Sequence, residues 1–171
     1  ELPVISENNE IVNSFVLTNY KELNKSTEMV GRASLYLKAI NTLDGSDVRV
    51  SKRGNIPYSR LRGFERGKIG PVDGNDYIGG NYISALNLST NIPGLLPTNE
   101  ILDFNYFIDI ANVWGVDYND ALDNSKMRSS TGIGLNVISP IGPISFSLSQ
   151  PITKASSDKT ESFRFNIGTT F

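Results

Sequence analysis

The chain has 171 residues, enough for one domain of ordinary size, and its formal net charge of −2 provides no global field to recruit nucleic acid or an anionic membrane surface. The absence of cysteine and histidine excludes disulfides, thiolate chemistry, histidine-based metal sites and hydrolases that rely on an imidazole base. Charged residues, glycines and prolines interrupt every apolar run before it reaches the roughly 18 residues of a membrane-spanning helix, which excludes a helical membrane protein.

In chain order, residues 1–4 lack the basic start and apolar core of a signal peptide, which leaves a cytoplasmic, an already processed or an excerpted chain. From residue 11 onward, apolar and polar residues alternate with a period of two, and glycine, asparagine, aspartate or proline separates the alternating segments. This pattern predicts seven strands, at residues 11–20, 29–39, 78–92, 101–114, 128–137, 144–149 and 163–171. No segment keeps a helical period, so the predicted fold class is all-β and antiparallel.

The polar faces of the predicted strands indicate where the strands lie. Serine, asparagine and glycine dominate these faces, whereas a soluble sandwich would favour Lys and Glu on faces turned to water. Such faces are typical of a partly hydrated barrel interior, with the opposite, apolar faces in lipid. Periodicity places Asp103, Asn105 and Asp109 on one polar face, and Arg128 and Ser130 on the polar face of the next strand.

The connections between the predicted strands alternate in length, which is a second sign of an outer-membrane barrel. Short connections at 22–27, 93–99 and 139–142 alternate with longer ones at 41–77, 115–125 and 153–161. In such barrels the short turns face the periplasm and the long loops face outward. We therefore predict an antiparallel transmembrane β-barrel, in which the long loop at 42–77 is extracellular in origin.

Seven strands cannot close a barrel of this kind. Each unpaired backbone group at an open edge costs several kcal/mol in lipid, and known bacterial single-chain barrels have even strand counts. We therefore expect residues 1–171 to be the C-terminal part of a larger barrel domain. An alternative is that several copies complete one barrel together, which a discrete detergent-stable oligomer would favour.

A basic segment occupies the middle of the long loop. Between Arg49 and Lys68 there are seven cations and a single anion, Glu65, a composition that usually marks a solvated loop. Its centre, residues 61–67, combines arginine, glycine and phenylalanine, as expected where the backbone turns sharply and brings two side chains to one place.

Residues 61–81, 107–114 and 128–171 each carry a motif, and the three segments together resemble the C-terminal half of the barrel in the BamA family of outer-membrane protein assembly factors. The first is Leu61-Arg62-Gly63-Phe64, followed by Ile69-Gly70-Pro71 and Gly79-Gly80-Asn81, which is similar to the family's Val-Arg-Gly-Phe/Tyr motif in the sixth extracellular loop. The second, residues 107–114, is similar to the family's aromatic-x-Asp-x-Gly strand motif. The third runs from Arg128-Ser129-Ser130-Thr131-Gly132 through residues 139–144 to residues 163–168 and Phe171.

The match extends from about residue 28 to the end of the chain, with the family's order and spacing. Two departures are mild. Leu61 stands where the family often has valine, and Ala111 stands where it usually has glycine. The family's barrel has sixteen strands. Residues 1–171 contain no counterpart of the first half of that barrel or of the family's N-terminal periplasmic domains.

The resemblance implies that the sixth loop folds back into the barrel lumen, where its arginine pairs with the strand aspartate. Arg62 would then bind Asp109, which a planar guanidinium can do through two parallel hydrogen bonds. The loop–lumen residues implied are Arg62, Gly63, Phe64, Asp109, Arg128 and Ser130. For Arg128 and Ser130 a purely structural place in the lumen is an equal alternative, and the other cations of the basic segment are expected to be solvated.

The resemblance also implies a weak seam between the last and first strands of the barrel, where client strands are templated. The residues implied there are Phe163, Phe165, Ile167, Gly168 and Phe171. The apolar members are expected to form a lipid-facing stripe, and Gly168 to let the strand kink. The alternative interpretation is an ordinary closing strand with an aromatic residue at the membrane interface.

The function implied is non-enzymatic assembly and insertion of β-barrel proteins into the bacterial outer membrane. The partners implied are unfolded outer-membrane β-barrel clients, outer-membrane lipids and accessory assembly lipoproteins. A related pore that secretes a passenger protein is the alternative, while an outer-membrane hydrolase without histidine would need an unusual base. The sequence shows no phosphate-binding loop, metal-ligand cluster or other cofactor site, and its charge argues against a nucleic-acid module built on Tyr58 and Phe64.

Overall fold

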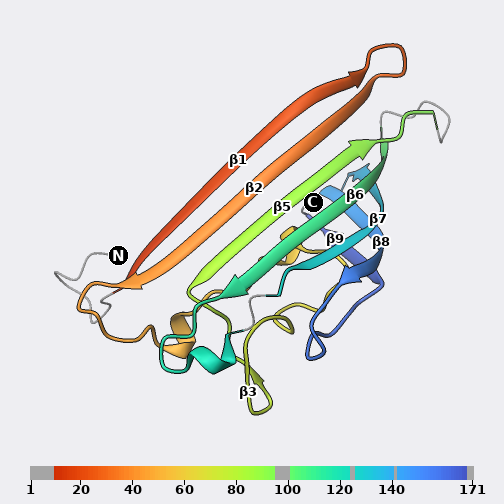
Figure 1. Cartoon of the computed structure of the whole chain (residues 1–171). Coiled ribbons are helices and arrows are strands. Elements are labelled where there is room, and N and C mark those ends of the chain that lie inside the picture. The colour runs from red at the N-terminus through yellow and green to blue at the C-terminus, as the bar shows by residue number, and fades with distance from the viewer. Residues whose placement is uncertain (1–9, 95–100, 124–125, 141, 169–171) are drawn as a thin grey trace.

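The computed structural model describes residues 10–94, 101–123, 126–140 and 142–168. Seven antiparallel strands form one sheet in the order β1-β2-β5-β6-β7-β8-β9, which confirms the predicted all-β fold (Figure 1). The strands are β1 (Glu10–Asn24), β2 (Met29–Thr42), β5 (Tyr82–Asn91), β6 (Leu102–Trp114), β7 (Arg128–Ser139), β8 (Gly142–Thr153) and β9 (Phe163–Ile167). No helix in these described ranges is long and apolar enough to cross a membrane.

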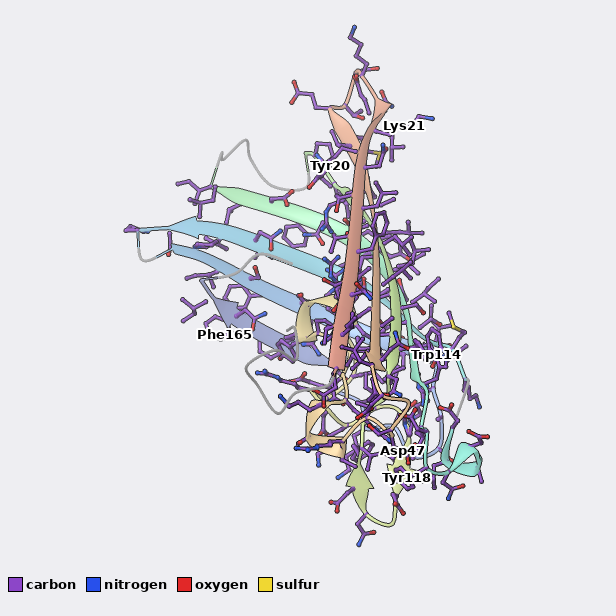
Figure 2. All side chains as sticks on the ribbon, turned by 90° about the vertical axis from the view of Figure 1, so that its left-hand side faces the viewer. Tyr20, Lys21, Asp47, Trp114, Tyr118 and Phe165 are labelled. Atoms are coloured by element: carbon purple, nitrogen blue, oxygen red, sulfur yellow. The ribbon has the colours of Figure 1, made fainter. Side chains whose placement is uncertain are left out.

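The small elements all lie in the long connections. The two-residue strands β3 (Val72–Asp73) and β4 (Asp76–Tyr77) form a hairpin, and three single-turn 3-10 helices are η1 (Val50–Lys52), η2 (Tyr58–Arg60) and η3 (Asp120–Leu122). The turn between β1 and β2 lies at one end of the sheet, which we call the turn end, and the long connections gather at the other, which we call the loop end. Figure 2 shows Tyr20 and Lys21 at the turn end, far from Asp47 and Tyr118 at the loop end.

Several predicted strand boundaries were wrong, among them the ends of β2 and β8, which extend to Thr42 and Thr153 beyond the predicted limits at residues 39 and 149. β1 extends to Asn24, beyond the predicted limit at residue 20. β5 begins at Tyr82 instead of residue 78, because Gly79 adopts a left-handed φ of +66° that an extended strand cannot include. β9 ends at Ile167, where Gly168 has a φ of +85°, and Phe171 lies outside the described residues. The connection from β2 to β5 therefore covers residues 43–81, and we call it the inner loop.

The convex face of the sheet carries large apolar side chains that are exposed. They include Phe15, Leu17, Leu37, Leu88, Tyr106, Ile133, Leu148, Phe163, Phe165 and Ile167, each between 37% and 55% exposed. Cross-strand pairs such as Phe15–Leu37, Tyr106–Ile133 and Leu148–Phe163 lie on the same face, so that one apolar surface runs across the sheet. A surface of this extent is typical of a lipid-facing barrel wall.

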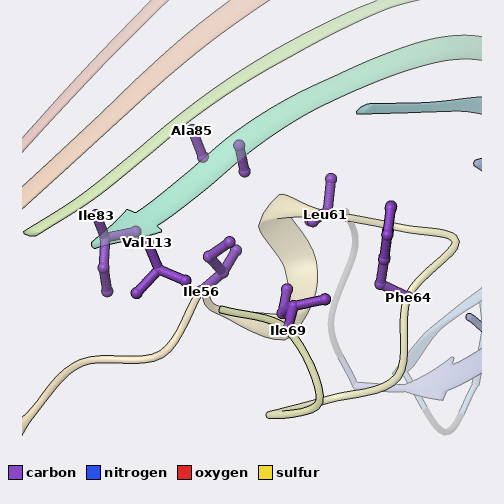
Figure 3. Close-up of a cluster of buried hydrophobic side chains, with 8 residues drawn as sticks. Ile56, Leu61, Phe64, Ile69, Ile83, Ala85 and Val113 are labelled. Atoms are coloured by element: carbon purple, nitrogen blue, oxygen red, sulfur yellow. The ribbon is translucent and has the colours of Figure 1, made fainter. Parts of the chain in front are cut away.

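The hydrophobic core lies on the opposite, concave face, between the sheet and the inner loop (Figure 3). Its buried members are Ile56, Leu61, Phe64 and Ile69 of the inner loop and Ile83, Ala85, Ala111 and Val113 of β5 and β6. Leu61 and Ala111, the two residues that differ from the family's usual ones, therefore belong to the same cluster. The apolar residues of β5 and β6 in this cluster occupy the face predicted to be polar, because the inner loop covers that face near the loop end.

Candidate functional site

The inner loop is bound to the sheet at a buried ion pair between Arg62 and Asp109. The Nε and Nη2 atoms of Arg62 donate to the two carboxylate oxygens of Asp109 at 2.7 and 2.8 Å, and the Arg62 backbone amide donates at 3.1 Å. Asn87 Nδ2 of β5 adds a fourth bond at 2.8 Å. Asp109 is 0% exposed and Arg62 is 4% exposed. Four donors therefore replace the water that Asp109 lost on burial.

The ring of Phe107 stacks against the guanidinium of Arg62. The Arg62 Cζ atom lies 3.4 Å from the centre of the Phe107 ring, and Phe107 is fully buried. Phe107 pairs across the strands with Gly132 of β7. A Cβ atom at Gly132 would lie 2.8 Å from the tip of the Phe107 ring, so this glycine leaves the space that the ring occupies.

Gly63 turns the chain directly after Arg62. Its φ is +88°, a left-handed conformation that favours glycine, and a Cβ atom there would lie 3.0 Å from the Ser130 Cβ. The Ser130 hydroxyl in turn donates to the Arg62 carbonyl. The turn thus allows close approach to β7, and the next residue, Phe64, enters the core cluster with 1% of its surface exposed.

The sheet and the connection before β9 also bind the backbone of residues 58–64, which we call the anchor segment. Arg164 donates to the carbonyl groups of Tyr58, Leu61 and Phe64 at 2.5, 3.2 and 2.6 Å. Asn87 donates to the Arg60 carbonyl at 2.8 Å, and Ser130 donates to the Arg62 carbonyl. The Glu161 amide donates to the Gly63 carbonyl at 3.1 Å. Because these are main-chain acceptors, the segment is held in one backbone conformation.

Arg164 of β9 was missed as a site residue. It is 1% exposed, and its Cζ atom lies 3.5 Å from the centre of the Tyr58 ring. The available signal was its position between Phe163 and Phe165, because an arginine on the lumen face of a membrane strand requires buried partners. Periodicity assigned Arg164 to the polar face, but its three carbonyl partners are far away in the sequence.

Arg128 belongs to a second buried cluster. Its Nε and Nη2 atoms donate to Asp158 at 3.0 and 3.2 Å, and Nη1 donates to Asn112 at 2.8 Å. Asp158 also accepts from the Ala155 amide at 2.6 Å and, more weakly, from the Gly70 amide of the inner loop at 3.4 Å. Arg128 therefore reaches the inner loop through Asp158, a residue that the sequence analysis had not singled out.

The expectation that the remaining cations of the basic segment are solvated was wrong for two of them. Arg60 Nη1 donates to Ser34 of β2 at 2.8 Å, and its guanidinium lies over Tyr36. Arg53 is 7% exposed and donates through Nε to the Val48 carbonyl. The exposed cations are Arg49, Lys52, Arg66 and Lys68.

The long connections also bind one another at the loop end. Asp117, in the connection after β6, accepts from the Val48 amide at 2.8 Å and from Asn81 Nδ2. The neighbouring Tyr118 hydroxyl donates to Asp73 of β3 at 2.7 Å. This hydrogen bond is the largest cause of a raised pKa for Tyr118, since it favours the protonated phenol.

A polar cavity of about 190 Å³ lies on the turn-end side of Arg62. Its lining includes Arg32 of β2 and Asp103 and Asn105 of β6. The Arg62–Asp109 pair thus lies between the apolar core cluster and a polar space. Arg62 lines this cavity, whereas Asp109 is fully buried beneath the inner loop.

The residues predicted for the seam lie on β9 and just beyond it. Phe163, Phe165 and Ile167 point to the convex face and are 54%, 46% and 55% exposed. Phe165 contacts Phe146 of β8, with ring centres 5.1 Å apart. Gly168 donates its amide to the Pro143 carbonyl at 2.7 Å. β9 pairs with β8, and among the described residues its other edge has no strand partner.

The model of the Omp85 superfamily domain matches residues 3–171. The chain belongs to the Omp85 superfamily. Within it, the chain is 28% identical over 142 residues to the outer membrane protein assembly factor BamA of Neorickettsia risticii (strain Illinois), covering 81% of the chain. It is 28% identical over 142 residues to BamA of Neisseria meningitidis serogroup B, covering 65% of the chain.

The fold comparison agrees with this assignment. A crystal structure of BamA from Haemophilus ducreyi lacking POTRA domains 1-3 matches 96% of the chain with a TM-score of 0.84 and 30% identity. The resemblance to the BamA family is therefore confirmed, and the Omp85 barrel fold indicates the bacterial outer membrane as the location. The chain spans 19% and 17% of the two BamA sequences and 35% of the crystallised chain.

Proposed function

We propose that this chain is the C-terminal part of an Omp85 barrel that assembles and inserts β-barrel proteins into the bacterial outer membrane. Its sheet supports this proposal, because both outer strands, β1 and β9, lack a second neighbour among the described residues. An open strand edge in lipid is too costly to persist, so further strands of the same barrel are needed to cover it. Residues 43–81 are then the sixth loop, folded into the lumen.

The observation that carries the proposed mechanism is the short ladder between β9 and β8. β9 pairs with β8 through five residues, whereas β8 is twelve residues long and β1 fifteen. A short, weakly paired strand leaves a seam at its free edge, and an incoming strand can bind to such an edge by β-augmentation. Addition of a client strand to this edge makes and breaks backbone hydrogen bonds but no covalent bonds, so the proposed function is not enzymatic.

The convex face supports the proposed partners. Phe163, Phe165 and Ile167 place an apolar stripe beside the seam, where an inserting client and the outer-membrane lipids would meet. The clients are unfolded β-barrel proteins, and accessory assembly lipoproteins act with parts of the protein outside residues 1–171. In this proposal the anchor segment holds the inner loop in the lumen while Arg62, Gly63, Phe64, Asp109, Arg128 and Ser130 maintain its position directly or through Asp158.

Site-specific cross-linking in the full-length protein tests the seam. Asn166 of β9 and Asn136 of β7 both pair with Ser145 of β8, so they lie at the same height on either side of that strand. A photoreactive residue at Asn166 should cross-link to a denatured barrel client during insertion into proteoliposomes, and the same residue at Asn136 should not.

The same experiment evaluates the second candidate, a pore that secretes a passenger. The polar cavity beside Arg62, which Asn136 also lines, supports this candidate, because a passenger that moves through the lumen would pass this position. Cross-links at Asn136 with none at Asn166 would support secretion and contradict insertion at the seam. Loss of client insertion when the wild-type protein is omitted is the control for activity.

A further inference from the structure

Arg164 belongs to β9, but its guanidinium serves the inner loop. Three hydrogen bonds run from it to the carbonyl groups of Tyr58, Leu61 and Phe64, at 2.5, 3.2 and 2.6 Å. The carboxylate of Glu161, three residues away, is more distant, at 3.4 Å from Nε and from Nη2, and Glu161 is partly exposed. The main partners of Arg164 are thus backbone atoms of the anchor segment.

The connection that precedes β9 binds the inner loop as well. Thr160 forms an isolated antiparallel bridge with Phe64. The Glu65 amide donates to the Lys159 carbonyl at 3.0 Å, and the Glu161 amide donates to the Gly63 carbonyl at 3.1 Å. β9 therefore has two attachments: five residues of β8 on one side, and the anchor segment across the lumen face.

The anchor segment is in turn bound to three other strands. Asn87 of β5, Asp109 of β6 and Ser130 of β7 each form a hydrogen bond with it. Of these three residues Asp109 is the charged one, and it accepts from Arg62 Nε at 2.7 Å. A continuous series of contacts thus runs from Asp109 through Arg62 and the anchor backbone to Arg164. The described structure shows each of these contacts as a direct hydrogen bond.

We infer that Arg164 is the positioning residue of the seam: it couples β9 to the anchor segment, so that this second attachment of β9 depends on the bond between Arg62 and Asp109. An arginine suits this task because its fork of donors reaches three carbonyl groups at once. Release of the loop would free the strand whose edge receives a client. This inference rests on the proposed function only in assigning the seam to β9.

Hydrogen exchange of backbone amides in the full-length protein, in detergent or nanodiscs, tests the coupling without requiring activity. Asp109→Asn lies on β6, away from β9, and keeps the size of the side chain. In the wild-type background it should accelerate exchange of the β9 amides by about tenfold or more, the scale expected when hydrogen bonds to a charged group are lost. In an Arg164→Gln background the β9 amides already exchange faster, and Asp109→Asn should add nothing.

A purely structural Arg164 would give a different result. The two substitutions would then accelerate β9 exchange independently, and Arg164→Lys would restore wild-type exchange because it keeps the charge. Additive effects, or β9 amides that do not respond to Asp109→Asn, would overturn the inference. Ser130→Ala, which removes only the bond to the Arg62 carbonyl, provides a second and milder release if Asp109→Asn does not fold.

A matched control and a second readout separate this inference from the proposed function. Asn166→Ala alters the same face of β9 at a side chain for which no bond to the described part of the inner loop is seen, and it should leave loop exchange unchanged. If exchange shows the coupling but the wild-type protein inserts no client, the inference stands and the proposed function fails. If client insertion occurs but β9 and the loop exchange independently, the inference alone fails.

Discussion

The β1–β2 hairpin and the strands from β5 to β9 are stabilised in different ways. β1 and β2 are fifteen and fourteen residues long and pair along almost their whole length, with Arg60 of the inner loop reaching β2 at Ser34. The strands from β5 to β9 share the inner loop on their concave face, through Asn87, Asp109, Ser130 and Arg164.

The two outer strands of this sheet are thus held differently: β1 by a long backbone ladder, and β9 by a short ladder together with a buried side chain. β1 needs no buried arginine because its ladder is long. β9 has a ladder of five residues, and a buried side chain supplies what the ladder lacks. Substitutions that break the anchor contacts with β6, β7 or β9 should therefore loosen the strands from β5 to β9 and leave the hairpin unchanged.

The largest expected effect is loss of the Arg62–Asp109 pair. Arg62→Ala and Asp109→Ala should each lower the free energy of unfolding by about 3–5 kcal/mol, because the partner is left buried and unpaired. The double variant should be hardly worse than either single variant, in stability and in client insertion. Urea unfolding of the full-length protein measures the first, and proteoliposome insertion the second.

Arg66→Ala is the control for that pair, since Arg66 is an exposed cation of the same loop. Its unfolding should remain close to wild type. Additive losses in the double variant would count against direct pairing. Faster hydrogen exchange in β1 as well as in β9 would contradict the contrast between the two parts of the sheet.

The next effect is a matched pair of glycine substitutions. Gly63 and Gly67 both have left-handed φ values, of +88° and +67°, but a Cβ atom meets Ser130 at 3.0 Å only at Gly63. Gly67→Ala should cost about 1–2 kcal/mol through backbone strain alone. Gly63→Ala should cost more and also weaken the Ser130 bond. Equal losses, measured by urea unfolding, would show that contact with β7 adds nothing.

A smaller effect is expected from Ala111→Gly, which introduces the residue that the BamA family usually has. The change removes a buried methyl group from the core cluster and adds backbone freedom, so it should cost about 1–2 kcal/mol. Ala33→Gly on β2, which lies outside that cluster, provides the comparison, with a cost of about 0.5–1 kcal/mol. A smaller loss at Ala111 than at Ala33 would exclude packing against the inner loop as the cause.

The smallest effect is expected at the loop end. The pKa of Tyr118 is raised above its ordinary value of 10.0, chiefly because the phenol donates to Asp73. A raised folded-state pKa means that this contribution to stability is present below pH 10 and is lost as the pH rises through the folded-state pKa. Tyr118→Phe should therefore be slightly less stable than wild type at neutral pH, and the difference should vanish at high pH.

Thermal unfolding of both proteins across that pH range measures the Tyr118 effect. The ring that lies beside Arg53 remains in Tyr118→Phe, so only the hydroxyl bond is tested. A difference that persists at the highest pH would show that the Asp73 bond is not its source. Loss of client insertion would be unexpected, because Tyr118 does not belong to the anchor segment.

Several features of this chain follow from its sequence alone. Alternation with a period of two identifies the strands and their faces, and thus placed Asp109, Arg128 and Ser130 on the concave side. A strand exposes successive side chains to opposite faces whatever its neighbours are, so this information is local. The Arg62-Gly63-Phe64 motif likewise indicates a turn before the loop's folded position is known.

Other features were decided by the tertiary structure. Ile83, Ala85 and Val113 are apolar on a face predicted to be polar, because the inner loop excludes water there. Arg164 binds main-chain carbonyl groups, which every residue has, so no side-chain pattern could reveal its partners. Alternation determined which face Arg164 lies on, and only the folded path of residues 43–81 determined what it meets there, because the two segments are about a hundred residues apart in the chain.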